Sequence, residues 1–398
     1  MAKLLFITQK VDRQDDLLGI YHRWIEELAG RFDKISVICL YQGRNELPQN
    51  VYVYSLGKEK YHDADVRINA DQRIADSKNQ QSASSASNPR HPHHIKSRFL
   101  YRLIYIWRFY RYLWLLRHDY NTVFVHMNPE YVILGGLLWK LWNKKIILWY
   151  AHYLANLKLR VAAFFPDLIV TSTRLAYPLK SKKLLVLQQG IDTSRFRPAN
   201  PKSQIPNPKF RILFLGRIAP VKHIEVLLQA LATLENSGRQ PITLTVVGEP
   251  TAGKPDEFEY YESLKKLTEE LDLTYLVEWR PRVPNYATPE IFNGHDLFVN
   301  LTDTGSFDKS TLEAMACGLP VVVSNKAFKE IFPPPLVNQL LFEEKNYQDL
   351  AKKILEFLKL SKNDQVLIAK KMRTIIMEQH NLINLMDKLT QLIIKIKS

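Results

Sequence analysis

The stretch TGSFDKSTLEAMACGLPVVVSN, residues 304–325, predicts a polar loop, a short helix, a turn and a buried strand in direct succession. Ser310 and Glu313 have the spacing of a capping box, in which the serine caps the helix and the glutamate reaches back to it. Gly318 and Pro320 are expected to end the helix. A helix that begins behind a small-residue loop offers free amides and a positive dipole end to an anion. This stretch alone leaves two interpretations open, a purely structural helix and a phosphate site.

Short apolar stretches alternate with helical ones along most of the chain. They are mostly β-branched or aromatic, as expected of strands buried on both faces of a parallel sheet. The first half contains KLLFIT, KISVICL, VYVYSL, TVFVHM, KIILWY, DLIVTS and LLVLQQ, with helical candidates at 18–30, 95–117, 130–142 and 156–165. The second half contains RILFLG, ITLTVVGE, YLVEW and DLFVNL, with helical candidates at 222–236 and 256–271. The expected fold class is α/β, with two doubly wound Rossmann-like domains facing a central cleft.

The segment RFRPANPKSQIPNPK, residues 195–209, interrupts this alternation with four prolines among polar residues. Such a composition is typical of a linker or hinge. We therefore expect an N-terminal domain at 1–197, a hinge at 198–209 and a C-terminal domain at 210–375. A final helix at 376–398 is expected to pack back toward the N-terminal domain.

Residues 62–94 form a polar, low-complexity break within the first domain. They contain too few apolar side chains to order themselves, so we interpret them as a mobile loop. His91, His93 and His94 lie in this segment and raise the alternative of a metal site. A solvated polar loop is the interpretation that we favour, and we expect no metal site.

The composition of the 398 residues narrows the classes of partner. Lys and Arg number 55 against 40 Asp and Glu, a net charge of +15. This excess suggests an anionic partner, either nucleic acid, an acidic membrane face or a phosphorylated small molecule. The sequence contains no recognised nucleic-acid module, so we expect no nucleic acid. Two cysteines, Cys39 and Cys317, allow no disulfide framework or zinc spacing. With no apolar run of membrane-spanning length, we expect a cytoplasmic protein or one bound peripherally at the inner face of the membrane.

Four segments, in this order, carry a resemblance to a known family. They are QQGIDTSRFRP (188–198), FLGRIAPVKHIEVLLQAL (214–231), TVVGE (245–249) and LEAMACGLPVVVSN (312–325). Together they resemble glycosyltransferase family 4. The resemblance implies the GT-B architecture, an acceptor-side N-terminal domain and a nucleotide-sugar-binding C-terminal domain. It also implies transfer of a sugar from a nucleotide-sugar to a glycan or lipid-linked acceptor, with retention at the anomeric carbon. No cofactor and no essential metal are implied, because the nucleotide-sugar is a substrate.

Two cations of the second domain resemble the family's diphosphate-binding pair. Arg217 follows a strand, directly after Gly216, and Lys222 opens the next helix. Their chemistry suits the role, because an arginine offers a fork of donors and a lysine a point charge to the leaving diphosphate. The alternative is a pair of solvated cations near a helix start, where they would oppose the helix dipole.

The opening stretch resembles the family's donor-binding loop, with one departure. Glu313 resembles the second glutamate of the family's Glu–seven residues–Glu motif, which binds the ribose hydroxyls. The first glutamate falls at Gly305, so we expect Asp308 to replace it as the carboxylate that contacts the sugar. The resemblance assigns the whole loop and helix start to the donor, namely Gly305, Ser306, Phe307, Asp308, Lys309, Ser310, Thr311, Leu312 and Glu313. The departure keeps a second function open, a catalytically inactive GT-B protein that binds nucleotide-sugar or glycan as a regulator or scaffold.

Three residues of the first domain complete the candidate set. His152, in LWYAHYL, follows a strand where the family often has a histidine facing the donor sugar, and we include it among the catalytic candidates. His126, in VFVHMNPE, lies at another strand end. Either histidine can instead be a packed residue. Gly19 lies between the first strand and helix, where family members have a flexible glycine loop, but a simple turn residue is equally consistent.

The stretch KSRFLYRLIYIWRFYRYLWLLR, residues 96–117, is both aromatic and basic. At 100° per residue its arginines spread around the helix, so it is not a clean amphipathic membrane helix. Its long side chains are compatible with an anionic membrane surface. The alternative is a helix of the domain with one packed side.

Overall fold

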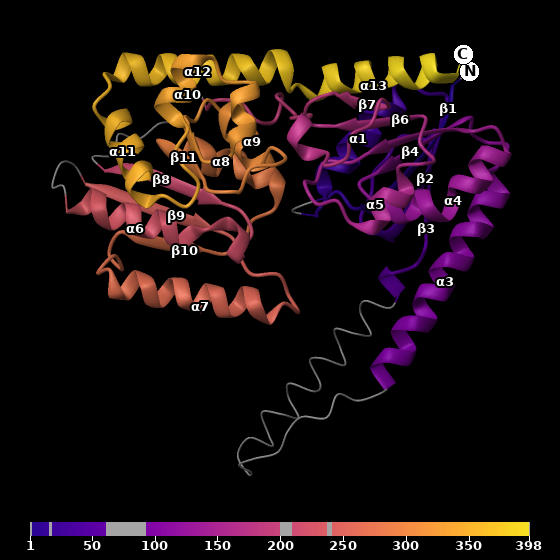
Figure 1. Cartoon of the computed structure of the whole chain (residues 1–398), viewed down its shortest axis with the longest axis horizontal. Coiled ribbons are helices and arrows are strands. Elements are labelled where there is room, and N and C mark those ends of the chain that lie inside the picture. The colour runs from indigo at the N-terminus through magenta and orange to yellow at the C-terminus, as the bar shows by residue number, and fades with distance from the viewer. Residues whose placement is uncertain (1, 16–17, 61–92, 200–208, 237–240, 398) are drawn as a thin grey trace, which may run out of the picture. The chain divides into compact units, whose positions relative to one another are not determined.

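A computed structural model of the chain describes residues 2–15, 18–60, 93–199, 209–236 and 241–397 (Figure 1). Its internal contacts divide the chain into two compact units. Unit 1 contains residues 1–150, 156–169 and 390–398, and unit 2 contains residues 151–155 and 170–389. The predicted loop at 62–94 lies outside the described residues except for His93 and His94, which begin a helix. The predicted hinge at 198–209 lies outside them over residues 200–208.

The first sheet has seven strands in the order β3-β2-β1-β4-β5-β6-β7. The strand pairs β1–β2, β2–β3, β1–β4 and β4–β5 are parallel, and Phe6 of β1 lies between Val37 of β2 and Phe124 of β4. The order reverses between β1 and β4, as in a doubly wound sheet. The strands are β1 Lys3–Val11, β2 Lys34–Gln42, β3 Val51–Ser55, β4 Thr122–His126, β5 Lys145–Trp149, β6 Leu168–Thr171 and β7 Leu184–Val186. The helices are α1 Gly19–Ala29, α3 His93–Leu116, α4 Pro129–Leu141 and α5 Leu157–Ala162.

The second sheet has five parallel strands in the order β10-β9-β8-β11-β12. Here the order reverses between β8 and β11, so the loops after these two strands meet at one edge. The strands are β8 Phe210–Leu215, β9 Ile242–Val247, β10 Val277–Arg280, β11 Leu297–Asn300 and β12 Val321–Val323. The helices are α6 Ile224–Glu235, α7 Pro255–Glu270, α8 Thr288–Asn293, α9 Lys309–Ala316, α10 Pro334–Leu340, α11 Tyr347–Leu358, α12 Lys362–Gln379 and α13 Leu382–Lys397.

Each sheet has its own buried core, because the strands are apolar on both faces. In unit 1, Trp24 of α1 packs edge-on against Trp149 of β5 with ring centroids 4.9 Å apart. In unit 2, Phe298 of β11 packs in the same way on Phe292 of α8, at 5.8 Å. Two separately cored, doubly wound sheets confirm the α/β fold class that the alternation predicts.

Candidate functional site

Asp308, and not Ser310, caps the amino end of α9. Its Oδ1 accepts hydrogen bonds from the amide of Ser310 at 3.2 Å and from the hydroxyl of the same residue at 2.9 Å. The predicted capping box is therefore wrong, because Ser310 lies inside the helix and Glu313 does not reach back to it. Asp308 takes the position because a carboxylate is the stronger acceptor beside the positive end of the helix dipole.

The other end of α9 is as the sequence predicts. Gly318 has a left-handed φ of 74°. Its amide donates to the carbonyl of Met315, and the amide of Leu319 donates to that of Ala314, each at 3.0 Å. This is a Schellman motif, which needs a residue that tolerates positive φ.

Lys222 forms an ion pair with Asp308 and thereby joins the loop after β8 to the amino end of α9. Lys222 lies at the end of a 3₁₀ turn, Pro220–Lys222, just before α6. Burial alone would raise the pKa of Asp308, but the charge of Lys222 and the hydrogen bonds from Lys222 and Ser310 outweigh it and lower that pKa. Asp308 is therefore ionised near neutral pH. The structure thus places a cation at the helix end where an anion is favoured.

Arg217 lies in the same loop and is paired with the buried Glu257 of α7, with Nη1 and Oε1 3.5 Å apart. Glu257 also accepts from the amide of Thr251 at 2.8 Å and from the ammonium of Lys254 at 3.0 Å. Burial would raise the pKa of Glu257, but these hydrogen bonds and the Arg217 charge together lower it. Glu257 is thus an ionised anchor that limits where the guanidinium lies. Sequence reasoning missed this residue, because the pairing spans 40 positions of the chain.

Gly216 and Gly248 bring the loop after β8 close to the loop after β9. A Cβ on Gly248 would lie 1.9 Å from the carbonyl oxygen of Gly216, and Gly248 itself has a φ of 157°. The amide of Gly216 donates to the carbonyl of Val247 at 3.0 Å. Only glycine fits at position 248, so this residue fixes the course of the segment that carries Arg217.

Glu313 is buried on α9, where its Oε1 accepts from the side-chain amide of Asn285 at 3.1 Å. Burial raises the pKa of Glu313 to about 7, and the Asn285 hydrogen bond and the Lys309 charge offset only part of this. Near neutral pH the carboxyl group is therefore present in both forms and offers a hydroxyl donor as well as an acceptor. Asn285 is a further partner that sequence reasoning missed.

The loop from Thr304 to Ser306 is fastened by side chains from other parts of unit 2. Asn325 donates to the carbonyl of Ser306 at 2.9 Å and accepts from the amide of Gly305 at 3.4 Å. Thr173 donates to the carbonyl of Gly305 at 3.3 Å. Glu344 accepts from the amide of Thr304 at 2.9 Å. The loop is thus held at each peptide, which favours a preorganised site.

Several residues that the resemblance assigns to the donor are buried. Phe307 packs edge-on against Phe328 and against His380, with centroids 5.1 and 5.3 Å away. The side chains of Thr311 and Leu312 are fully buried, and Ser310 is nearly so. The side chains of these four residues therefore support the site by packing rather than by contact with a ligand from the surface.

His152 and Tyr153 lie in the loop after β5 and belong to unit 2 by their contacts. Their rings are stacked, with centroids 4.9 Å apart and planes 11° from parallel. Nδ1 of His152 accepts from the amide of Leu154 at 3.1 Å, so the neutral ring carries its proton on Nε2. Desolvation lowers the pKa of His152, which favours this neutral form.

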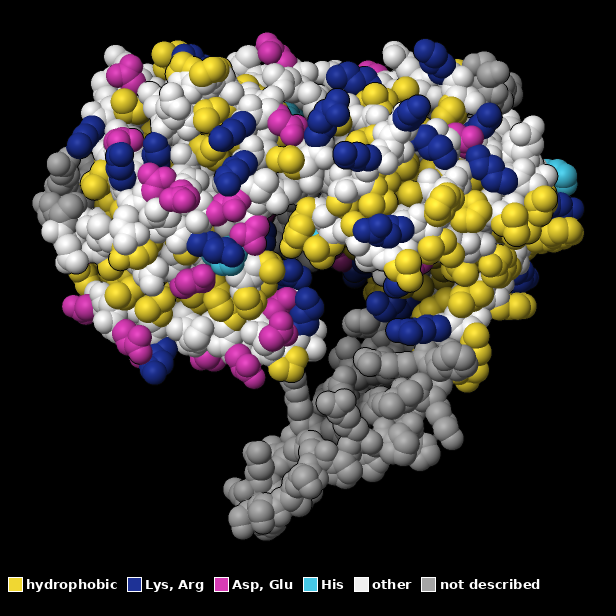
Figure 2. All heavy atoms as spheres, viewed as in Figure 1, with side chains coloured by type: hydrophobic (Ala, Val, Ile, Leu, Met, Phe, Trp, Pro, Cys, Tyr) yellow, Lys and Arg dark blue, Asp and Glu magenta, His cyan; other side chains and the backbone are white. Residues whose placement is uncertain are grey.

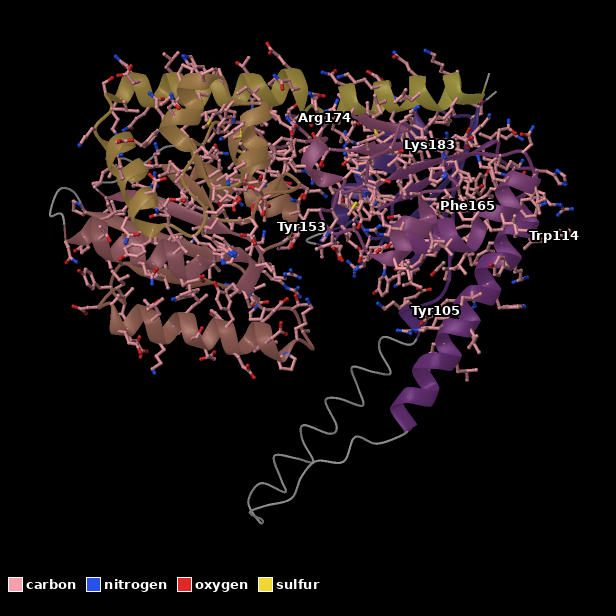
Figure 3. The ribbon with its side chains drawn as sticks, viewed as in Figure 1. Tyr105, Trp114, Tyr153, Phe165, Arg174 and Lys183 are labelled. Carbon is pink, nitrogen blue, oxygen red and sulfur yellow. The ribbon has the colours of Figure 1, made fainter. Side chains whose placement is uncertain are left out.

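Tyr153, labelled in Figure 3, lies directly against Gly305. A Cβ on Gly305 would lie 3.2 Å from Cδ1 and 3.4 Å from Cβ of the tyrosine. This is tighter than ordinary van der Waals contact, so any larger residue at 305 requires Tyr153 to move. Gly305, where the family pattern has a glutamate, therefore leaves room for the ring of Tyr153, which lies in the same loop as His152.

His126 and Gly19 lie in unit 1. His126 ends β4 and is buried among aromatic rings, with Tyr21 at 3.8 Å and Trp24 at 5.6 Å between centroids. This environment fits the packed-residue interpretation. Gly19 begins α1, its amide donates to the carbonyl of Asp15 at 3.1 Å, and a Cβ there would lie 3.2 Å from the carbonyl oxygen of Arg13.

The described ranges contain neither a cluster of metal-ligating side chains nor a helix that could cross a membrane. Outside the gaps named above, no group of three or more His, Cys, Asp and Glu side chains has the geometry of a metal site. Within the same ranges, none of the helices combines the length and apolarity that a membrane crossing requires.

Residues 196–373 match the sequence model of the family described as glycosyl transferases group 1. Two similar curated proteins are named D-inositol 3-phosphate glycosyltransferase. The protein from Thermomonospora curvata is 32% identical over 154 residues, covering 35% of each chain. The one from Frankia alni is 30% identical over 156 residues, covering 37% of this chain and 38% of its own. The chain thus spans little more than a third of the length of the curated relatives that it matches.

Solved structures resemble the chain over nearly its whole length. The sucrose-phosphate synthase of Thermosynechococcus elongatus superimposes with a TM-score of 0.75 over 100% of this chain and 99% of its own, at 16% identity. Anabaena HepE, solved in complex with UDP and glucose, gives a TM-score of 0.71 over 98% and 99%, also at 16% identity. At such identities the likeness concerns the fold. The chain therefore shares the GT-B fold of these structures, and its residues 196–373 are similar in sequence to glycosyl transferases group 1.

Proposed function

We propose that the protein is a glycosyltransferase that moves a sugar from a nucleotide-sugar to a glycan or lipid-linked acceptor, with retention at the anomeric carbon. The group 1 match, the names of the curated relatives and the fold support a transferase. The family 4 assignment and the stereochemistry rest on the motifs of the sequence. One structural observation carries the proposal: two cations, Arg217 and Lys222, lie in the loop after β8, and Lys222 meets the amino end of α9 at Asp308.

In the proposed mechanism these cations hold the donor's diphosphate. When the bond between the sugar and the diphosphate breaks, negative charge grows on the leaving oxygen. Arg217 offers a forked set of donors and Lys222 a point charge, so both stabilise that charge without a metal. Preorganised cations of this kind need no reorganisation at the moment of reaction. We propose accordingly that the reaction requires no metal ion.

Glu313 is proposed to bind the ribose of the donor. Its carboxyl group, with a pKa of about 7, offers both a donor and an acceptor to a pair of hydroxyls. Asn285 would then be a positioning residue, since it holds one oxygen of this group. Asp308 is proposed to contact the sugar, and His152 to donate a hydrogen bond from Nε2 to it. Gly19 and His126 stay proposals for the acceptor side.

The nucleotide is proposed to be UDP. The support is that Anabaena HepE was solved with UDP, with UDP and glucose, and with UDP-glucose. A location in the cytoplasm is a further proposal, consistent with two buried free cysteines.

A thermal-shift screen against UDP-, GDP- and ADP-sugars tests the donor. A donor present at 100 times its Kd adds about 2.7 kcal/mol to the free energy of unfolding. The nucleotide-sugar that stabilises the protein is then incubated with it, with and without EDTA. The amount of nucleoside diphosphate released and the anomeric configuration of the product are measured. Tight donor binding with no release, even with glycan and lipid-linked acceptors, would favour the alternative of an inactive regulator or scaffold, which the comparisons do not favour.

A further inference from the structure

The outer sides of α3, α4 and α5 form one continuous surface of unit 1 (Figures 1 and 2). The hydroxyl of Tyr110 on α3 donates to the carbonyl of Leu134 on α4 at 3.0 Å. The rings of Trp114 and Trp142 meet at 6.1 Å between centroids. On the other side of α4, a Cβ on Gly136 would touch the ring of Phe165, which follows α5. We call this surface the α3–α5 face and define it by the exposed residues Trp107, Trp114, Leu137, Leu141, Leu157 and Phe164.

These side chains are large, apolar and strongly exposed. Trp114 is 59% exposed, Leu141 70% and Phe164 80%. Trp107 and Trp114 are seven residues apart on α3, about two helical turns, and Leu137 and Leu141 are four apart on α4, so each of these helices presents an apolar side outward. Leu157 begins α5, and Phe164 follows its end. Figure 2 shows yellow, hydrophobic side chains gathered over this part of unit 1. A contiguous apolar region of this kind on a protein surface marks an interaction site.

The α3–α5 face also carries uncompensated positive charge. Arg117 lies over the ring of Trp114 at 4.4 Å, and Arg111 lies 5.8 Å from the ring of Trp107. Among the described residues, neither of them nor Arg160 of α5 has a carboxylate within ion-pair distance. The acidic groups on this side are already neutralised: Glu130 pairs with Lys158 and Asp167 with Lys140, both at 2.8 Å.

We propose that the α3–α5 face binds the surface of an anionic phospholipid membrane. Tryptophan and arginine side chains beside exposed leucines suit the boundary between lipid headgroups and acyl chains. A second copy of the chain fits less well, because a symmetric contact would bring the same arginines against each other. This inference goes beyond the proposed transferase activity and does not depend on it.

Co-sedimentation of the full chain with vesicles tests the proposal. The vesicles are pure phosphatidylcholine, or phosphatidylcholine mixed with phosphatidylglycerol, each at low and at high salt. We expect the protein to pellet with the mixed vesicles at low salt, to pellet much less with neutral ones, and to be partly released by salt because headgroup charges are screened. Equal recovery with both vesicles, or none with either, would overturn the proposal.

A pair of substitutions tests the apolar part. Leu137→Gln combined with Leu141→Gln removes two side chains that are 63% and 70% exposed, so folding is not at risk. The matched control is Val366→Gln with Leu367→Gln on α12, where the exposed fractions are 51% and 49%. We expect the first pair to weaken vesicle binding at least about tenfold, since each buried CH₂ group contributes substantially. The control pair should bind as the wild type does.

A second pair tests the charge. Arg111→Gln with Arg160→Gln should weaken binding to the mixed vesicles by about fivefold for each arginine. Lys265→Gln with Lys266→Gln on α7 makes the same change in net charge in unit 2, outside the α3–α5 face. If both pairs weaken binding equally, net charge and not the face is responsible, and the proposal fails. It also fails if sedimentation without lipid reveals a dimer that the Leu137 and Leu141 substitutions dissociate, because the face would then join two copies.

Discussion

Lys222 and Asp308 form an ion pair between the loop after β8 and the N-cap of α9. Asp308 thus has two tasks, since the same carboxylate caps the helix and holds the lysine. An incoming diphosphate would meet a cation that already has a counter-charge. Binding therefore requires Lys222 to be shared with, or taken from, Asp308.

Asp308→Asn separates these tasks. Asparagine keeps the cap, so α9 should stay intact, but it leaves Lys222 without its counter-charge and removes a negative charge beside the phosphates. We expect the affinity for nucleoside diphosphate to rise a few-fold, on the order of 1 kcal/mol for one partly exposed charge. At the same time kcat/KM for the nucleotide-sugar should fall and discrimination between sugar epimers should weaken. Calorimetry and kinetics with two epimeric donors measure both, and a loss of diphosphate affinity would contradict the assignment.

Arg217→Ala should lower turnover by about a hundredfold, the usual cost of losing one preorganised group that stabilises developing charge. Lys254→Ala is the matched control, because Lys254 also holds Glu257 but lies outside the loop that carries Arg217. Steady-state rates with the chosen donor measure the difference. Equal losses in the two variants would mean that both act through Glu257 and that Arg217 does not touch the phosphates.

Glu313→Gln should change the pH dependence of stability. The folded-state pKa of Glu313, about 7, lies above its ordinary value of 4.5. The folded state therefore prefers the protonated form of Glu313. The contribution of this group to the free energy of unfolding is fully present below pH 4.5 and is lost as the pH rises through 7. Glutamine cannot ionise, so the variant should be closer to the wild type at pH 5 and gain on it toward pH 8, by up to about 3 kcal/mol.

Denaturant unfolding of the two proteins without ligand at several pH values measures this gain. A difference between them that stays constant from pH 5 to 8 would show that Glu313 titrates normally.

Gly305 and Tyr153 should be energetically coupled, because a side chain at 305 meets the tyrosine ring. Gly305→Glu alone should lower kcat/KM by roughly tenfold as Tyr153 and the stacked His152 are displaced, a cost of about 1.4 kcal/mol. Tyr153→Ala in the same protein should recover part of this loss. A double-mutant cycle gives the coupling energy, and strictly additive effects would mean that Tyr153 does not constrain position 305.

The fold was predictable from sequence because its signals are local. Strands such as Leu297–Asn300 are short apolar runs, and the end of α9 follows from one glycine and one proline. The cap of the same helix was not predictable with certainty, since Asp308 and Ser310 are both good N-cap residues two positions apart. The carboxylate of Asp308 is the stronger acceptor beside the positive end of the helix dipole, and Lys222 pairs with it there.

The partners of the site residues were not predictable, because they come from distant parts of the chain. Asn285 reaches Glu313 and Glu257 reaches Arg217 only once the sheet is assembled. Tyr153 and Gly305, which are also in contact, likewise lie far apart in the sequence. Nothing in the local spacing of these residues indicates the pairing.

The central claim is that Lys222 helps to hold the diphosphate of a nucleotide-sugar while the sugar leaves. The most direct measurement is the rate at which nucleoside diphosphate is released from the donor. It is measured for the wild type and for Lys222→Ala side by side, with acceptor present. The account predicts release by the wild type and a rate about a hundredfold lower in the variant, with α9 still capped by Asp308. Equal rates in the two proteins would contradict it.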